Sequence, residues 1–166
     1  MNRLATLHFH GGDLSFSAGH FTVFSETHRE YLHGHHYRLD VSVTAPLDDL
    51  GLTFDYAIFD NKLAALCDQL DKHVLMPENC RYLSVKDEDP HYRITFNGQY
   101  MLLLKTDVIL LPIQNITIEE LSDWFIRQIE KDQDFLKQYQ IRDISVRIFN
   151  GLDHSATAVW QALEKP

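Results

Sequence analysis

The sequence predicts an α+β fold, on three observations. Residues 14–24 and 35–44 alternate apolar and polar side chains, as strands with one buried face do. Residues 55–70 and 118–129 instead repeat their apolar side chains every three or four positions, which is the helical period. The order along the chain is strand, strand, helix, hairpin, helix and a final strand at residues 144–149, which is typical of an α+β fold.

Length and composition narrow the class of protein. The 166 residues, 45% of them hydrophobic, fit one domain with a sizeable core, residues 1–166. The formal charge of −9 and the lack of a Lys and Arg cluster argue against a nucleic-acid partner. There is no apolar run of about eighteen residues and no signal-peptide pattern, so we expect no membrane span and a cytoplasmic location. Cys67 and Cys80 form no Cys-x-x-Cys pair, in keeping with a reducing compartment.

The first three elements are two strands and a helix. Residues 14–24 and 35–44 are predicted to pair as antiparallel neighbours. The helix over residues 55–70 can cover one face of this pair, because its apolar side chains form a single stripe. That stripe comprises Phe59, Leu63, Leu66 and Leu70.

The second half of the chain begins with a β-hairpin at about residues 92–104. Its Asn97-Gly98 pair suits a two-residue turn between strands. A second helix begins after Thr117, which makes a capping box with Glu120 three residues later. The buried stripe of this helix is predicted to comprise Ile118, Leu121, Phe125 and Ile129.

Three histidines have the spacing of a metal site. His33 and His35 lie two residues apart, so on a strand they project from one face while His36 points away. An antiparallel neighbour would bring His20 beside them. Three imidazoles leave the fourth position of a zinc ion open for water or substrate, which is typical of a catalytic zinc. Nickel, iron or cobalt would also accept three imidazoles, and some of the ten histidines could fall near one another by chance.

Several motifs resemble the 6-pyruvoyltetrahydropterin synthase and 6-carboxytetrahydropterin synthase family. The resemblance covers most of the chain and implies that His20, His33 and His35 bind zinc. It also implies that Thr117 and Glu119, in a Thr-x-Glu opening of the second helix, bind substrate. The motifs are Phe16-Ser17-Ala18-Gly19-His20, Leu32-His33-Gly34-His35-His36-Tyr37, the segments 51–56 and 70–75, and Asn115-Ile116-Thr117-Ile118-Glu119-Glu120-Leu121.

The family resemblance implies the tunnelling fold. In this fold an antiparallel four-stranded sheet carries two helices on one face, and copies join edge to edge into a β-barrel with active sites between subunits. We therefore expect a homo-oligomer, in which the hairpin at about 92–104 is an insertion. The implied substrate is 7,8-dihydroneopterin triphosphate, whose C6 side-chain hydroxyls bind the zinc ion. The implied reaction is triphosphate elimination or carbon–carbon cleavage on that side chain.

The first departure from the family pattern concerns the catalytic thiol. Other members carry a cysteine four positions before the His-Gly-His pair, where this chain has Arg29 followed by Glu30. The segment resembles a subgroup that uses glutamate instead and releases 6-hydroxymethyl-7,8-dihydropterin. A carboxylate is a competent general base, so Glu30 is predicted to be catalytic. The alternative is that Glu30 is a solvated loop residue.

A second departure concerns the Asp-His proton relay of the family. Asp71 is followed by Lys72, and the histidine comes one place later as His73. His73 would reach the site if the end of the helix unwinds, or Asp153 and His154 would supply the pair instead. The alternative for His73 is a partly exposed histidine, favoured by the dipole at the carboxyl end of the helix.

A third departure concerns the glutamate with which the family binds the pterin ring. Asn150 stands in this neighbourhood and offers one acceptor and one donor, whereas Asp153 would keep the carboxylate chemistry if it swings in. Alternatively, Asn150-Gly151 is simply a turn. The cations nearest in sequence for the triphosphate are Arg29, Lys72 and Arg81.

Together these features predict a zinc-dependent lyase that acts on the C6 side chain of 7,8-dihydroneopterin triphosphate. One alternative is a 6-carboxytetrahydropterin synthase of queuosine and 7-deazapurine biosynthesis. Another, from a different class, is a paralogue that binds zinc and pterin without catalysis. Products of turnover would separate these three hypotheses.

Overall fold

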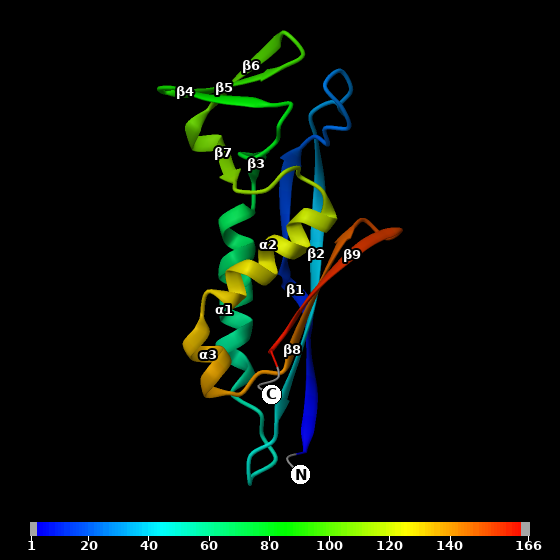
Figure 1. Ribbon diagram of the computed structural model, residues 1–166, viewed down its shortest axis with the longest axis vertical. Coiled ribbons are helices and arrows are strands. Elements are labelled where there is room, and N and C mark those ends of the chain that lie inside the picture. Colours follow the sequence, from blue (N-terminus) through cyan, green and yellow to red (C-terminus); the bar gives the residue numbers. More distant parts are fainter. Residues whose placement is uncertain (1–2, 164–166) are drawn as a thin grey trace.

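The computed structural model describes residues 3–163 and contains two sheets and three α-helices within that range (Figure 1). Its elements in chain order are β1 (Leu4–His20), β2 (His33–Pro46), α1 (Tyr56–Leu70), β3 (His73–Pro77), β4 (Ser84–Glu88), β5 (His91–Phe96), β6 (Gln99–Leu104), a 3₁₀ turn (Lys105–Asp107), β7 (Val108–Leu111), α2 (Ile118–Glu130), α3 (Gln133–Gln138), β8 (Asp143–Asn150) and β9 (His154–Gln161).

The main sheet has six strands in the order β7-β3-β1-β2-β8-β9, so the prediction of four strands is wrong. Strands β1, β2, β8 and β9 pair antiparallel, as expected, while β3 pairs parallel with both β1 and β7. The two extra strands are five and four residues long. Runs this short show too little alternation to be recognised, and their parallel pairing joins segments that are distant in sequence.

Strand β1 differs most from its predicted bounds. It begins at Leu4 rather than at residue 14 and ends at His20 rather than at residue 24. The early part also alternates, with Phe9 buried between the exposed His8 and His10, but the register with β2 shifts between His10 and Ser15. This irregularity obscures the continuity of the strand in the sequence.

The helices α1 and α2 pack on the same face of the main sheet, as predicted (Figure 1). The Asp55 carboxylate caps α1 by accepting a hydrogen bond from the Ala57 amide at 3.0 Å. Full burial of one Leu or Phe side chain stabilises such a core by about 1.5–3 kcal/mol. The buried residues that join helices and sheet include Phe59, Leu63, Leu70, Leu121, Phe125, Ile129, Leu39, Val41, Val43, Ile144, Val146 and Ile148.

The predicted hairpin is present as β5 and β6, and β4 extends it to a three-stranded antiparallel sheet. Asn97 and Gly98 form its turn with φ angles of 45° and 72°, which suit a type I′ turn. This small sheet packs on a second apolar cluster, separate from the main core. The second cluster comprises Phe21, Val23, Met76, Cys80, Leu83, Ile94, Phe96 and Val108.

The small sheet lies at the end of the main sheet where β1 ends and β2 begins (Figure 1). The loop between those strands, residues 21–32, contributes Phe21 and Val23 to the second cluster. This end of the molecule therefore brings together the loop, the small sheet and the segment before α2. Within the described part of the chain, no helix is long and apolar enough to span a membrane.

Candidate functional site

The three predicted metal ligands lie together at this end of the main sheet. His20 and His33 are direct partners in the β1–β2 register, and Ala18 faces His35 in the next inward-facing pair. One ring nitrogen from each of the three histidines lies within 4.8 Å of the other two. The Nε2 atoms of His33 and His35 are 2.9 Å apart. Antiparallel pairing thus produces the cluster that the spacing predicted.

The main-chain hydrogen bonds of His20 and His33 direct an Nε2 lone pair of each ring toward the cluster. The Nδ1 atom of His20 donates to the Ile116 carbonyl at 2.9 Å, and that of His33 donates to the Tyr31 carbonyl at 2.7 Å. Since a neutral imidazole carries one proton, the Nε2 atom of each of these rings holds a lone pair. The Nε2 atom of His20 is buried without a hydrogen-bond partner, which costs about 1–3 kcal/mol unless something binds it. A divalent ion such as zinc fits this donor set.

Electrostatics also favour the neutral form of two of the three histidines. Burial lowers the pKa of His20 to about 4, helped by His33 and His35 and opposed by the bond to Ile116. Burial and the neighbouring His33 likewise lower the pKa of His35. Neutral imidazole is the form that binds a metal ion, so these side chains need lose no proton near neutral pH.

Glu30 lies beside the histidine cluster rather than out in solvent. Its amide donates to the Thr22 carbonyl at 2.9 Å, and its Oε2 atom accepts from the Thr22 amide, also at 2.9 Å. Burial raises the pKa of Glu30, but hydrogen bonds from Thr22 and the charges of His33 and His20 outweigh this effect, and the pKa lies below its usual value. The carboxylate is therefore ionised near neutral pH and held at a fixed position.

The Arg29 guanidinium contacts two aromatic rings and a main-chain carbonyl. Its guanidinium carbon lies 4.6 Å from the ring centre of Phe21 and 5.7 Å from that of Phe96. Its Nη1 atom donates to the Glu30 carbonyl at 2.6 Å. The guanidinium is thus engaged inside the protein, which argues against the predicted contact between Arg29 and a triphosphate.

His73 is released from α1, because the helix ends at Leu70. Asp71 has extended backbone angles, and Lys72 has a left-handed φ of 62°, so His73 begins β3. The Nδ1 atom of His73 donates to the main-chain carbonyl of Asp71 at 2.8 Å, which leaves Nε2 free. A cleft of about 420 Å³ is lined by both His73 and His35.

The expected Asp-His pair is not formed by the Asp71 carboxylate. Its Oδ1 atom accepts from the Ser17 amide at 2.8 Å, and its Oδ2 atom lies 3.3 Å from the Lys72 ammonium group. The hydrogen bond from Ser17 is the main cause of the lowered pKa of Asp71. Asp71 therefore contacts His73 only through its main chain.

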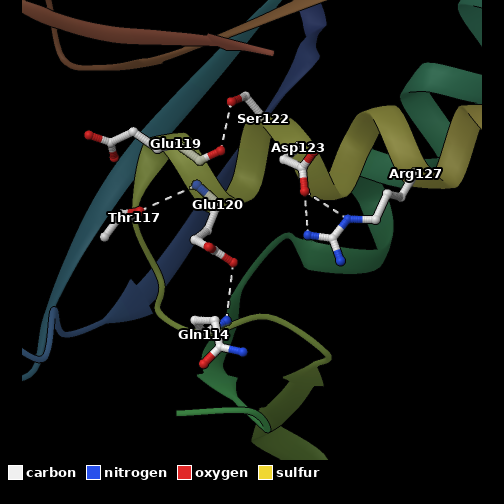
Figure 2. Close-up of polar contacts among 7 residues, drawn as sticks. All are labelled: Gln114, Thr117, Glu119, Glu120, Ser122, Asp123 and Arg127. Atoms are coloured by element: carbon white, nitrogen blue, oxygen red, sulfur yellow. Dashed lines mark hydrogen bonds and ion pairs between the residues drawn. The ribbon is translucent and has the colours of Figure 1, made fainter. Parts of the chain in front are cut away.

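The opening of α2 carries the predicted Thr117 and Glu119 (Figure 2). The Thr117 hydroxyl caps the helix by accepting from the Glu120 amide at 3.3 Å. The Glu120 carboxylate accepts from the Gln114 amide at 3.1 Å instead of returning to Thr117, so only half of the predicted capping box forms. Figure 2 shows the exposed Glu119 carboxylate pointing away from Glu120 and Gln114, while its main-chain oxygen accepts from Ser122.

The remaining candidates, Asn150, Asp153 and His154, lie at the turn between β8 and β9 or directly beside it. Asn150 is the final residue of β8 and the register partner of Tyr37, two positions after His35. Gly151 has a φ of 67°, as a turn requires, so a turn begins directly after Asn150, and the role of Asn150 in pterin binding stays a prediction. Asp153 and His154 are exposed, and the structure shows no hydrogen bond from either to the histidine cluster among residues 3–163.

The sequence analysis missed two side chains that build the site. The ring of Tyr37 lies 5.9 Å from the rings of both His20 and His35, and its hydroxyl is buried without a partner. The Asn115 side chain makes two hydrogen bonds to the main chain of Val23. Its Oδ1 atom accepts from the Val23 amide at 3.0 Å, and its Nδ2 atom donates to the Val23 carbonyl at 2.8 Å. Tyr37 continues the alternation of His33 and His35, so a signal for it existed, whereas nothing local links Asn115 to Val23.

Comparison with known proteins decides the family. The sequence model of the 6-pyruvoyl tetrahydropterin synthase family matches residues 13–160. The chain belongs to this family. A Methanocaldococcus jannaschii protein, provisionally named 6-carboxy-5,6,7,8-tetrahydropterin synthase, is 31% identical over 150 residues, covering 89% of this chain and 90% of the relative. The predicted family resemblance is therefore confirmed.

Solved structures of synthases from this family share the fold. The 6-pyruvoyltetrahydropterin synthase of Plasmodium vivax is 25% identical, with a TM-score of 0.91 over 97% of this chain and all of that chain. A mutant of that enzyme, in which a catalytic glutamate is replaced by cysteine, is 24% identical with a TM-score of 0.92 and the same coverage. The family's enzymes are lyases that act on pterins. Closure of the sheet into an oligomeric barrel stays a prediction.

Proposed function

We propose that this family member is a zinc-dependent lyase that acts on the C6 side chain of 7,8-dihydroneopterin triphosphate and uses Glu30 as its base. The observation that carries the proposal is the Glu30 carboxylate, which two hydrogen bonds to Thr22 hold close to His20 in the fold. The P. vivax synthase also has a catalytic glutamate, which a cysteine replaces in one mutant. A related enzyme thus has a glutamate as a catalytic residue, while the two cysteines of this chain are buried, Cys67 in the main core and Cys80 in the second cluster.

His20, His33 and His35 would hold the metal ion. When bound, zinc acts as a Lewis acid that makes a nearby hydroxyl more acidic. The protein contributes the orientation of the three rings, through Ile116 and Tyr31 for His20 and His33. These hydrogen bonds fix which ring nitrogen of His20 and His33 would face the ion.

Glu30 would remove the proton of a side-chain hydroxyl. Carbon–carbon cleavage then needs a proton delivered to the carbon left on the pterin. His73 is the candidate for that transfer, because its Nδ1 is fixed by Asp71 and its Nε2 can exchange a proton. The C1′–C2′ bond breaks, the deprotonated C2′ hydroxyl becomes the carbonyl of a departing two-carbon aldehyde that carries the triphosphate, and C1′ takes up the proton to give 6-hydroxymethyl-7,8-dihydropterin.

The pterin ring would bind near the opening of α2. The exposed Glu119 carboxylate has two acceptor oxygens, which match an amino group and an adjacent ring N–H of a pterin. Thr117 is already committed to capping α2, so we propose for it a lesser share in binding. Asn150 would contribute through its place opposite Tyr37.

A second candidate is 6-carboxytetrahydropterin synthase activity, and it is favoured by the name of the M. jannaschii relative. Both activities would use the same substrate and metal, so product identity decides between them. The purified, zinc-loaded protein is incubated with 7,8-dihydroneopterin triphosphate, and the pterins are identified by mass spectrometry. The first proposal predicts a 6-hydroxymethyl product, the second a 6-carboxy product, and absence of any product would contradict both.

A further inference from the structure

Arg29 joins two parts of the molecule that the main core does not connect. Its guanidinium lies between the ring of Phe21, in the loop of residues 21–32, and the ring of Phe96, at the end of β5. A guanidinium over an aromatic ring is attracted by the negative face of the ring, and more strongly where water is excluded. Arg29 is half-buried, so these contacts tie the loop to the small sheet.

The same side chain also touches the main chain of the proposed base. Arg29 donates to the Glu30 carbonyl, while the Glu30 amide and carboxylate are bonded to Thr22. Glu30 is thus held by its amide, its carbonyl and its carboxylate. The attachment from Arg29 reaches Phe96 of the small sheet directly through one side chain, whereas Thr22 reaches that sheet through its neighbours Phe21 and Val23.

The loop has little other support from the main core. Val23 and Arg29 face each other across an isolated antiparallel bridge, and Asn115 holds Val23 from the segment before α2. The apolar side chains of the loop, Phe21 and Val23, pack in the second cluster together with Phe96. The position of Glu30 therefore depends on that cluster, while the histidines depend on the main sheet.

We propose that Arg29 is a positioning residue for Glu30, and that Phe96, at the end of β5 in the small sheet, supports the proposed base because it provides one face of the Arg29 stack. The inference rests on the role of Glu30 in the proposed function. A lysine could not replace Arg29, since it lacks the planar group that stacks between two rings and donates sideways to a carbonyl. Misplacement of a catalytic group by about 1 Å can lower the rate of an enzyme about 100-fold.

The test compares Arg29→Lys with Arg93→Lys. Arg93 is a matched control in the small sheet, because it too stacks on an aromatic ring. Its guanidinium carbon lies 4.1 Å from the ring centre of Tyr100, and its Nε atom pairs with Glu88. We expect Arg29→Lys to lower kcat for 7,8-dihydroneopterin triphosphate at least about tenfold, with KM and metal content unchanged. Arg93→Lys should retain the wild-type kcat.

A second readout does not require turnover. Amide hydrogen exchange of Thr22, whose N–H is bonded to Glu30, should accelerate at least about tenfold in Arg29→Lys and stay unchanged in Arg93→Lys. Phe96→Leu, which keeps an apolar side chain but removes one face of the stack, should change both readouts in the same direction by a smaller factor.

The outcomes separate this inference from the proposed function. Unchanged Thr22 exchange in Arg29→Lys would overturn the inference whatever the activity, and so would unchanged kcat in an active protein. A raised KM with unchanged kcat and exchange would instead assign Arg29 to triphosphate binding. Faster Thr22 exchange in a protein whose wild type has no turnover would support the positioning role and contradict the proposed function alone.

Discussion

The main-chain amide of Thr22 lies 2.9 Å from the Oε2 atom of Glu30, and the Glu30 amide returns a bond of 2.9 Å to the Thr22 carbonyl. Thr22 follows His20 by two residues, so this reciprocal pair brings a carboxylate back beside the end of β1. The histidine cluster, shared by the end of β1 and the start of β2, and the fixed Glu30 carboxylate thereby lie at the same end of the main sheet.

Metal binding should depend on His20 but not on His36, which directly follows the cluster residue His35 in the sequence. His20→Ala removes a buried ligand, and we expect the zinc content measured by elemental mass spectrometry to fall well below one ion per chain. His36→Ala is the control, because the His36 ring points to Ser17, with Nδ1 3.0 Å from its hydroxyl oxygen. Equal zinc content in the two variants would contradict the assignment of His20 as a ligand.

The stability of the metal-free protein should fall on acidification. The pKa of His20 is about 4 in the folded chain against 6.5 for an ordinary histidine, so the unfolded chain binds the extra proton first. Stability is then fully present above about pH 6.5 and is lost as the pH falls toward 4, by up to about 3 kcal/mol. Urea unfolding of the chelated protein across this range measures the change, and His20→Asn should reduce the slope. The exposed His8→Asn should leave it as in the wild type.

The cap of α2 should contribute to stability independently of chemistry. Thr117→Ala removes the acceptor for the Glu120 amide, and we expect the free energy of unfolding to fall by about 1 kcal/mol. Thr117→Ser keeps a hydroxyl and should retain most of that stability. Chemical denaturation of both variants tests this, and equal stability losses would show that the methyl group rather than the cap matters.

His73 and Asp71 should differ in their effect on turnover. His73→Gln removes the Nε2 atom that would deliver the proton to the pterin carbon, so kcat should fall at least about tenfold. Asp71→Asn keeps an acceptor for the Ser17 amide and does not alter the main-chain carbonyl that fixes His73, so its effect should be smaller. Steady-state kinetics of the pair provides the measurement, and a greater loss in Asp71→Asn would mean that the carboxylate itself carries the proton.

Local patterns in the sequence account for much of the fold. The stripes of Phe59 and Leu63 in α1 and of Leu121 and Phe125 in α2 follow the helical period, and the Asn97-Gly98 turn carries its own conformational preference. The metal-binding cluster was predictable for a similar reason. A two-residue spacing fixes the shared face of His33 and His35, and antiparallel pairing supplies His20.

Features that depend on distant segments were not predictable. Strands β3 and β7 are recognisable only through their parallel pairing. The orientations of Arg29 and Glu30 are a clearer case, because adjacent residues point to different surroundings. Phe96 attracts Arg29 from a sheet far along the chain, and Thr22 bonds Glu30 through a loop whose path no local pattern specifies.

The most direct test of the account is turnover of 7,8-dihydroneopterin triphosphate by zinc-loaded Glu30→Gln, beside Glu26→Gln as a control from the same loop. Glu26 is exposed, and its replacement should leave activity at the wild-type level. Glutamine keeps an acceptor oxygen for the Thr22 amide but cannot take a proton, so Glu30→Gln should lose turnover at least about 100-fold while retaining its zinc. Wild-type turnover in Glu30→Gln, with zinc bound, would contradict the assignment of Glu30 as the base.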